Sequence, residues 1–394
     1  MIYLDNNATT RPEGPVVSAM AEMLSDLWHN PSSIHRPGQR AKGRVEAARR
    51  QVAQLIGAHA SEIVFTSGGT ESINIAIRGA CLLAKDDGRD TIVTTAVEHF
   101  AVAELCKAMA AEHGMTVVVA PLSADGVVDL DAVDALINDR TALVAIQWAN
   151  NETGAIHPVE RIAQMCAERG VRSYSDATQW IGKMPTDVAR VPIDMLTLSG
   201  HKFHGPKGAG AMFIRKGVDL APLFHGSQER NRRGGTENTA GCVGLGVAST
   251  IAHEWMDDPE NPQAVAERRD RFERAILDRV PGAAVNGPTA PGSRLWNTTN
   301  IAFPNAEAEI LLLTMSERGL CASGGSACAS GSVVVSPILL AMGIPEDRAI
   351  GSIRFSLSRH TTDAEIDEAV GIVVGCYERV KAPGAARSVA VTSD

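Results

Sequence analysis

Short apolar runs alternate with helical periods of hydrophobic residues from about residue 60 to residue 215. The apolar runs, which resemble buried strands in length and composition, lie at residues 91–97, 116–120, 141–148, 171–174, 195–198 and 209–214. Two stretches between them repeat hydrophobic residues at the i, i+3, i+4, i+7 spacing of one helix face: Val102, Leu105, Cys106 and Met109, then Val159, Ile162, Ala163 and Cys166. This alternation predicts an α/β fold, with a mostly parallel sheet between helices.

The pattern changes near Asn261, where a polar stretch rich in Asp, Glu, Pro and Asn ends the alternation and a charged helix begins. Two further strand-like runs follow at residues 300–303 and 352–357, with helical stretches between and after them. We therefore expect a large domain over residues 15–260, and a smaller α+β domain formed by residues 1–14 and 261–394.

The composition of the 394-residue chain is that of a globular protein, with 44% hydrophobic and 21% charged residues. Its net charge of −9 includes no basic stripe, so nucleic acid is not an expected partner. No apolar run approaches the roughly 20 residues that span a bilayer, and the N-terminus lacks the segments of a secretory signal. Seven cysteines without paired spacing fit reduced thiols. We expect a cytoplasmic protein with no membrane contact.

The strongest local signal is the segment 199–208, Ser-Gly-His-Lys-Phe-His-Gly-Pro-Lys-Gly, which directly follows a predicted strand. A lysine held at a strand end can lose its proton through desolvation and form an imine with a carbonyl compound. The alternative for Lys202 is an ordinary solvated surface lysine.

Asp176 ends another apolar run, 26 residues before Lys202. Ligands of parallel sheets gather at the carboxyl ends of the strands, so both side chains are expected at one crevice. A carboxylate opposite a Schiff-base lysine suits pyridoxal phosphate, because the acid keeps the ring nitrogen protonated. A helix cap is the alternative for Asp176.

A phosphate group needs a cradle, and residues 66–72, Thr-Ser-Gly-Gly-Thr-Glu-Ser, offer one between a strand and a helix that begins near Glu71. Free backbone amides, a hydroxyl group and the positive end of a helix all favour an anion at this point. The same residues also form a good capping turn. The segment lacks the lysine of a nucleotide-binding P-loop.

Three more polar residues stand where strands are expected to end or to face inward. His99 closes the run 91–97 and is placed to stack on a cofactor ring, although a structural role is the alternative. Asn151 follows the run 141–148, where a simple turn is possible. Arg354 lies in a strand-like segment, either facing inward to bind a carboxylate or exposed at an edge.

Cys328 lies among Gly, Ser and Ala residues, which offer little bulk for a buried thiol to pack against. An accessible loop of this kind suits a thiol nucleophile that must reach a crevice and later deliver its cargo. The remaining cysteines are interpreted as small core residues: Cys81, Cys106, Cys166, Cys242, Cys321 and Cys376. No cysteine or histidine spacing matches a zinc site.

With these residues in order, the chain resembles the cysteine desulfurases of the fold-type I pyridoxal-phosphate superfamily, and most of all the nitrogen-fixation type. The matching motifs span residues 3 to 358 and include Asn30-Pro-Ser-Ser, Thr66-Ser-Gly-Gly-Thr-Glu-Ser, Trp148-Ala-Asn-Asn-Glu-Thr-Gly, Asp176-Ala-Thr-Gln, Ser199-Gly-His-Lys, Gly235-Thr-Glu-Asn and Gly325-Ser-Ala-Cys. The resemblance implies a large domain whose mostly parallel sheet has seven strands.

The resemblance also implies the role of each matching residue. Lys202 would carry the cofactor, Asp176 would pair with its ring nitrogen, and His99 would stack on the ring. Asn151 and Gln179 would bind the phenolic oxygen, while the phosphate would be held by Gly69, Thr70, Ser199 and His201. Thr236 would reach the phosphate of the other subunit of a homodimer. Asn30 and Arg354 would bind the substrate carboxylate.

The implied reaction converts L-cysteine to L-alanine and leaves its sulfur on Cys328 as a persulfide, with His99 as the base for the thiol. The sulfur would pass to an iron–sulfur scaffold protein, with nitrogenase cluster assembly as the suggested destination. The chain is expected to have no metal site of its own, although Cys328 could transiently ligate a cluster shared with a scaffold. A selenocysteine lyase, an aminotransferase and a catalytically silent scaffold are the competing interpretations.

Three departures from the family pattern lie near the substrate or the Cys328 loop. His29 stands where relatives usually have Gly, and Gly324 stands where they usually have Ser. Residues 333–335 are Val-Val-Val, where the family commonly shows Leu-Glu-Pro. We expect a similar loop with a different exit.

Overall fold

A seven-stranded sheet organises most of the chain in the computed structural model, which describes residues 1–324 and 335–381. Its strand order is β2-β8-β7-β6-β5-β3-β4. The strands are β2 (Ile63–Thr66), β3 (Thr91–Thr95), β4 (Thr116–Ala120), β5 (Thr141–Ala145), β6 (Arg172–Asp176), β7 (Met195–Ser199) and β8 (Gly210–Ile214). Only β8 runs antiparallel to its neighbours in this sheet. The predicted α/β fold is confirmed.

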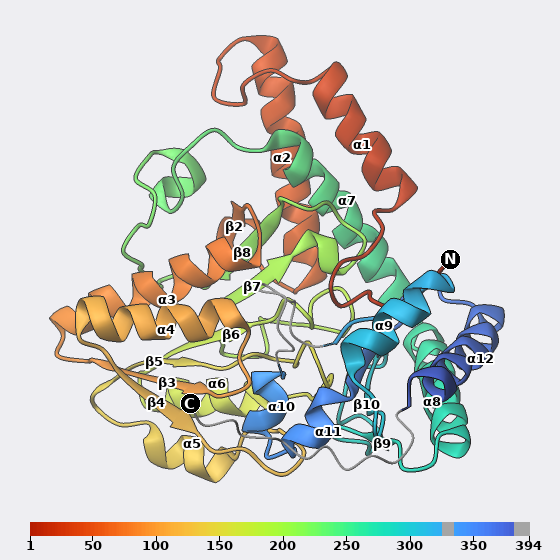
Figure 1. Cartoon of the computed structure of the whole chain (residues 1–394). Coiled ribbons are helices and arrows are strands. Elements are labelled where there is room, and N and C mark those ends of the chain that lie inside the picture. The colour runs from red at the N-terminus through yellow and green to blue at the C-terminus, as the bar shows by residue number, and fades with distance from the viewer. Residues whose placement is uncertain (325–334, 382–394) are drawn as a thin grey trace, which may run out of the picture.

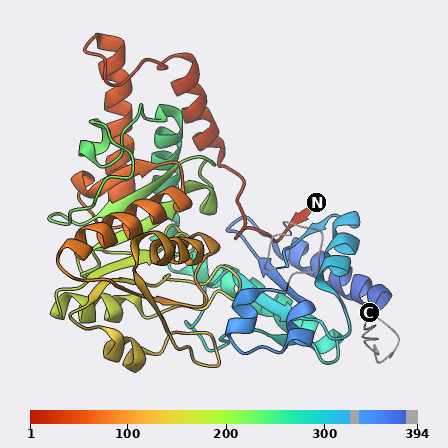
Figure 2. The same cartoon turned by 60° about the vertical axis from the view of Figure 1, so that its left-hand side comes forward.

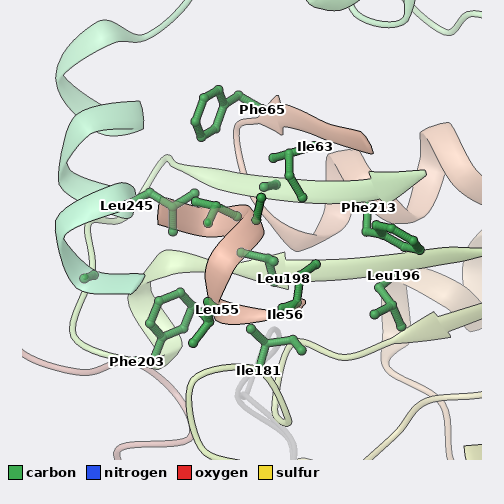
Figure 3. Close-up of a cluster of buried hydrophobic side chains, with 14 of the residues drawn as sticks. Leu55, Ile56, Ile63, Phe65, Ile181, Leu196, Leu198, Phe203, Phe213 and Leu245 are labelled. Carbon is green, nitrogen blue, oxygen red and sulfur yellow. The ribbon is translucent and has the colours of Figure 1, made fainter. Parts of the chain in front are cut away.

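Alternating side chains of the strands enter different hydrophobic clusters, as the period of two requires. Ile63 and Phe65 pack on one side of the sheet, whereas Val64 between them packs on the other. Leu196 and Leu198 join the first of these clusters, which Figure 3 shows together with Leu245 from a covering helix. Because both sides of each central strand are apolar, helices must cover both faces.

Helices lie on both faces of this sheet (Figure 1). The face of Ile63 and Phe65 is covered by α2 (Arg36–Leu55) and α7 (Thr239–Met256), with α1 (Gly14–Ser25) packed against α7, and farther along by α5 (Leu130–Leu136) and α6 (Val159–Glu168). The opposite face is covered by α3 (Gly69–Asp86) and α4 (Phe100–His113). The two predicted helix stripes are confirmed, since all eight of their residues are buried.

A second, three-stranded antiparallel sheet has the order β12-β10-β9. It consists of β9 (Ala284–Val285), β10 (Thr298–Ala302) and β12 (Ser352–Ser356), and its core includes residues of α8 (Glu260–Arg279), α9 (Ala308–Glu317) and α12 (Asp363–Val380). Nearby, β1 (Ile2–Tyr3) pairs in parallel with β11 (Leu320–Cys321). Figure 2 shows these C-terminal elements beside the large sheet. The shorter elements are α10 (Pro337–Ala341), α11 (Glu346–Ile350), η1 (Ala60–Glu62), η2 (Gly200–Lys202) and η3 (Gln228–Asn231).

The strand predictions hold, but β3 and β5 end two and three residues before their apolar runs, and β10 and β12 end one residue before theirs. The run 141–148 continues to bond β6 beyond Ala145, since the backbone N–H of Trp148 donates to Asp176 O (3.0 Å). On the β3 side, however, the backbone N–H of Gln147 donates to the carboxylate of Glu98. A side chain thus replaces a strand bond there, which apolar character alone cannot reveal.

The predicted domain boundary at residue 260 lies at the start of α8, and three residues separate α8 from the end of α7. The division of the chain into two domains stays a prediction. Of the helices formed by residues 1–324 and 335–381, none has the length and apolar character needed to cross a membrane.

Candidate active site

A cavity of about 360 Å³ opens at the carboxyl ends of strands of the large sheet and reaches β12 of the small sheet. Most of the predicted site residues line it: Gly69, Thr70, His99, Asn151, Asp176, Gln179, Ser199, His201, Lys202 and Arg354. These residues come from separate segments between positions 69 and 354, so the fold brings together what the sequence keeps apart.

Lys202 ends the short helix η2, immediately after β7. Its Nζ donates to the backbone oxygens of Asn7 (2.7 Å) and Ala8 (2.9 Å). Burial, together with the positive charge of Arg354, lowers the pKa of Lys202 from 10.5 to about 8. The alternative of a freely solvated lysine is therefore wrong, and an appreciable share of this amine is neutral and nucleophilic near neutral pH.

Asp176 is the last residue of β6 and is buried. Because β6 and β7 are parallel neighbours, with Asp176 paired to Thr197, their following side chains reach the same edge of the sheet. One carboxylate oxygen of Asp176 accepts from the backbone N–H of Thr178 (3.0 Å). The helix-cap alternative is wrong, because Asp176 caps a turn and no helix lies among residues 177–194, before β7 begins. Asp176 also lines the cavity.

The predicted phosphate cradle lies at the N-terminus of α3, which begins at Gly69, two residues before the predicted start. Gly68 precedes it with φ 154° and ψ −172°, a backbone region that essentially only glycine adopts. The first amides of a helix have no partner within the helix, so those at Gly69 and Thr70 suit an anion. Ser199 and His201 line the same cavity.

His201 is a neutral side chain at physiological pH, because burial and the nearby Lys202 lower its pKa to about 4. Its Nδ1 lies 3.1 Å from the Thr9 hydroxyl oxygen. It can therefore bind an anion through a hydrogen bond, without adding a positive charge.

His99 is the N-cap of α4, and its Nδ1 accepts from the backbone N–H of Ala101 (3.1 Å). The structural alternative for this histidine is therefore correct, and because His99 also lines the cavity, its stacking on a cofactor ring stays a prediction. With Nδ1 accepting, Nε2 is the ring atom left to exchange a proton.

Arg354 is buried in β12, so the alternative of an exposed edge arginine is wrong. Its guanidinium donates to the Asp5 carboxylate (2.7 Å) and to the backbone oxygen of Asn151 (3.0 Å). Its Nε has no partner among the described residues, which leaves a buried N–H at the cavity. Such a fixed guanidinium fits a substrate carboxylate.

Three predicted residues lie elsewhere. Asn30 is exposed in the loop between α1 and α2, which stands at the top in both Figures 1 and 2, and its side chain accepts from Ser32 N (2.8 Å). Thr236 lines a separate cavity with Thr66 and Ser67, the first two residues of the predicted phosphate cradle. Cys328 lies outside the described residues. Of the predicted roles, those of Asn30 and Thr236 thus find no support within a single chain.

Comparison with known proteins identifies the family to which this chain belongs. The model of the aminotransferase class-V family matches residues 2–369. The chain belongs to this family.

Similar members include the cysteine desulfurase of Nostoc sp., 47% identical over 97% of this chain and 94% of its own length. The cysteine desulfurase NifS of Azotobacter vinelandii is 46% identical over 94% of this chain and 90% of its own length. A solved NifS-like protein has a TM-score of 0.89 at 35% identity, covering 96% of this chain and all of its own. The predicted resemblance is confirmed.

Class-V aminotransferases are pyridoxal-phosphate enzymes, and the cavity fits that cofactor. Two buried oxygens in its wall, Asn151 Oδ1 and Thr178 Oγ1, lack a hydrogen-bond partner among residues 1–324 and 335–381. A polar ligand would satisfy them, since buried polar atoms are rarely left unpaired. The helix N-terminus at Gly69 suits its phosphate, and Lys202 and Asp176 are the amine and acid that its ring requires.

Asn7 has no role predicted from the sequence, yet it forms hydrogen bonds to several residues around the cavity. Its backbone oxygen accepts from Lys202, and its side-chain amide donates to Thr298 Oγ1 (2.9 Å) and to Asn151 O (3.2 Å). It therefore joins the N-terminal segment to both sheets. Its partners are remote in the sequence: the Asn7 backbone N–H donates to Ser356 Oγ (2.9 Å), which lies 349 residues away.

Glu98, which directly precedes His99, likewise has no role predicted from the sequence. It is fully buried, which raises its pKa from 4.5 to about 8. The Thr95 hydroxyl donates to it (2.7 Å), and so does the backbone N–H of Gln147 (3.0 Å). Glu98 thus ties the end of β3 to the end of β5 behind the cavity wall.

Proposed function

We propose that this protein is a cysteine desulfurase, which converts L-cysteine to L-alanine and retains the sulfur as a persulfide on Cys328. The observation that carries the proposal is the cavity in which Lys202 and Asp176 meet Arg354. The first two suit pyridoxal phosphate, and the third suits the carboxylate of an amino acid. The desulfurase relatives support L-cysteine as that amino acid, as does SspA, whose structure in complex with cysteine has a TM-score of 0.78 at 32% identity, covering 92% of this chain.

Three residues of the cavity would have a task in this reaction. Pyridoxal phosphate, when bound, would supply an electron sink for the bonds at the substrate α-carbon. Lys202 would hold the cofactor covalently, and its free amine would move a proton at the α-carbon. Asp176 would keep the ring nitrogen protonated. Arg354 would bind the substrate carboxylate and so orient the substrate.

The sulfur transfer balances without an external oxidant. The thiolate of Cys328 attacks the substrate sulfur, so that an S–S bond forms as the substrate C–S bond breaks. The electron pair of the broken bond stays on carbon, which takes up a proton and leaves as alanine. We assign to His99 the proton exchange with the Cys328 thiol. While Nδ1 accepts from Ala101 N–H, the neutral ring carries its proton on Nε2 and can donate it from there; to take up the thiol proton, the ring must first release that proton or the contact with Ala101.

The chain lengths on either side support access of Cys328 to the cavity. Ser323 lines the cavity and bridges to Arg354, and Cys328 follows five residues later. Five extended residues span up to about 18 Å, which is enough to cross a site of this size. On the other side, Ser336 donates to the buried carboxylate of Glu152 (2.6 Å), next to Asn151. Both ends of the intervening segment are thus held at the site.

We further propose a homodimer whose second subunit supplies Thr236 and Asn30, because neither reaches the cavity of its own chain. The sulfur acceptor would be an iron–sulfur scaffold protein, and the similarity to NifS makes nitrogenase cluster assembly the destination to test first. Co-purification of the persulfide-loaded enzyme with candidate scaffold proteins, followed by transfer of ³⁵S, would identify that acceptor.

The test of the enzymatic proposal is alanine release from L-cysteine under a thiol reductant. We expect Cys328→Ala to reduce the rate by ~100-fold or more, the scale on which removal of a reacting group acts. Its matched control is Cys321→Ala, since Cys321 is a partly exposed cysteine of β11. An unchanged rate in Cys328→Ala would refute the persulfide step, and no alanine from the unmodified enzyme would refute the desulfurase assignment.

A further inference from the structure

A second lysine, Lys183, lies behind the cavity and takes no part in the proposed reaction. It is buried, and its Nζ donates to Gln179 Oε1 (2.7 Å) and to Asn7 Oδ1 (2.9 Å). In the described part of the chain, no ion pair joins it to a carboxylate. Burial, Lys202 and Arg354 all lower its pKa well below 10.5. Burial of an amine without a counterion costs folding free energy, so a functional reason for this lysine is to be sought in its hydrogen bonds.

Lys183 and the backbone oxygen of Asn7 together fix the orientation of the Gln179 amide. The Asn7 oxygen can only accept, so Gln179 Nε2 faces it and donates to it (3.0 Å), and Gln179 Oε1 accepts from Lys183 Nζ on the other side. One N–H of this amide is left over, and Gln179 lines the cavity. The cavity wall is therefore furnished with a donor rather than an acceptor.

The hydrogen bonds around Lys183 extend to Lys202 through Asn7. The backbone oxygen of Asn7 accepts from both Gln179 Nε2 and Lys202 Nζ, while the side chain of Asn7 accepts from Lys183. Asn7 is thus held from both sides. Loss of the Lys183 amine would remove a donor from both Asn7 Oδ1 and Gln179 Oε1. Gln179 Oε1 would then keep no hydrogen-bond partner among the described residues, whereas Asn7 Oδ1 would keep the bond from Asn297 (3.0 Å).

We propose that Lys183 is a positioning residue, which keeps the Gln179 amide turned with its N–H toward the phenolic oxygen of bound pyridoxal phosphate. This inference rests on the proposed role of Gln179 as a cofactor ligand, but not on cysteine as the substrate. A donor at that oxygen stabilises its negative charge, and so lowers the proton affinity of the nitrogen that joins Lys202 to the cofactor. Lys183 thereby sets the pH at which the bound cofactor titrates.

The test is a pH titration of the absorption band of the bound cofactor, near 400 nm. In Lys183→Met, which keeps the length of the side chain and removes its donors, we expect the midpoint to rise by about one pH unit, or tenfold in proton affinity. Gln179→Leu should raise it similarly. The exposed Lys216→Met is the matched control, with an unchanged midpoint.

The double variant separates positioning from a direct effect of charge. If Lys183 acts through Gln179, adding Lys183→Met to Gln179→Leu moves the midpoint little further. A full additional shift in the double variant would overturn the proposal, as would an unchanged midpoint in either single variant. Should Lys183→Met fail to fold, Gln179→Leu alone still decides, because an unchanged midpoint there leaves Lys183 nothing to act through.

The other ionisable groups around the cofactor site stay in place in these variants, so they do not account for a difference between them. They are Asp5, Glu98, His99, Asp176, His201, Lys202 and Arg354. The titration does not depend on turnover. An enzyme that bound the cofactor but released no alanine would refute the proposed function, and would leave this measurement valid.

Discussion

The two walls of the cavity differ in how their charged groups are held. On the wall of the large sheet, Asp176 is the last residue of β6 and Lys202 ends η2, three residues beyond β7, so both are placed by the ends of neighbouring strands. On the wall of the small sheet, Arg354 lies in β12, which pairs with β10, and its side chain is held in addition by the ion pair with Asp5 and the bond to Asn151 O. Both walls are thus positioned by sheet structure, and the second adds an ion pair between side chains.

This difference suits the two proposed partners. A resident cofactor benefits from a rigid wall, because its reactive atoms must keep one geometry through every turnover. A substrate that enters and leaves needs a charged group that can bind the substrate carboxylate while it keeps its own hydrogen bonds to the protein. Variants on the first wall should therefore abolish chemistry, while variants on the second should mainly weaken substrate binding.

The largest effect is expected from Lys202→Ala. Removal of the amine takes away both the covalent hold on the cofactor and the base at the substrate α-carbon, so alanine release should fall by ~10²–10⁴-fold or more. The absorption band near 400 nm should disappear as well. Lys216→Ala makes the same change at an exposed lysine and should keep band and rate. A retained band in Lys202→Ala would contradict the assignment of the first wall.

A smaller and different effect is expected from Arg354→Lys. The lysine keeps the charge but loses the planar fork, so the KM for cysteine should rise by about tenfold or more, equivalent to ~1.4 kcal/mol. Because the first wall is intact, the cofactor band and its pH midpoint should stay as in the unmodified enzyme. A large fall in kcat at unchanged KM would show that the two walls are not separate in function.

The same contrast explains which parts of the site could be read from the sequence. Lys202 and Asp176 could be placed because each follows an apolar run, and the end of a parallel strand defines a position in space. Arg354 remained ambiguous between an inward and an exposed position, because its partner Asp5 lies 349 residues away. Sequence pattern reports local structure well and long-range side-chain pairing poorly.

The strands, helices and sheet type followed from hydrophobic periodicity, whereas Lys183 and Asn7 did not. A lysine carries no hydrophobic signal, and its usual place is the surface. Lys183 is buried where distant segments meet. Its Nζ contacts Asn7 and Gln179, and Asn7 in turn accepts from Asn297. Nothing within a short window of sequence indicates such a meeting.

The smallest effect on catalysis, and the clearest dependence on pH, is expected from Glu98→Gln. Glu98 lies behind the first wall, where the backbone already fixes the geometry, so the cofactor band should persist. Burial raises the folded pKa of this carboxyl group from 4.5 to about 8, so the folded state binds its proton more tightly than the unfolded state does. Ionisation of Glu98 therefore costs stability increasingly between these two pH values, and the glutamine avoids that cost.

The free energy of unfolding of Glu98→Gln, relative to the unmodified protein, should consequently rise from about pH 5 to pH 8 and level off above it. Denaturant titrations at several pH values measure this difference. Glu368→Gln, the same exchange at an exposed position of α12, is the control and should give a nearly constant difference. A difference that fell with rising pH would mean that Glu98 is stabilised as the anion by the Gln147 and Thr95 donors, and that the first wall relies on side-chain pairing as much as the second.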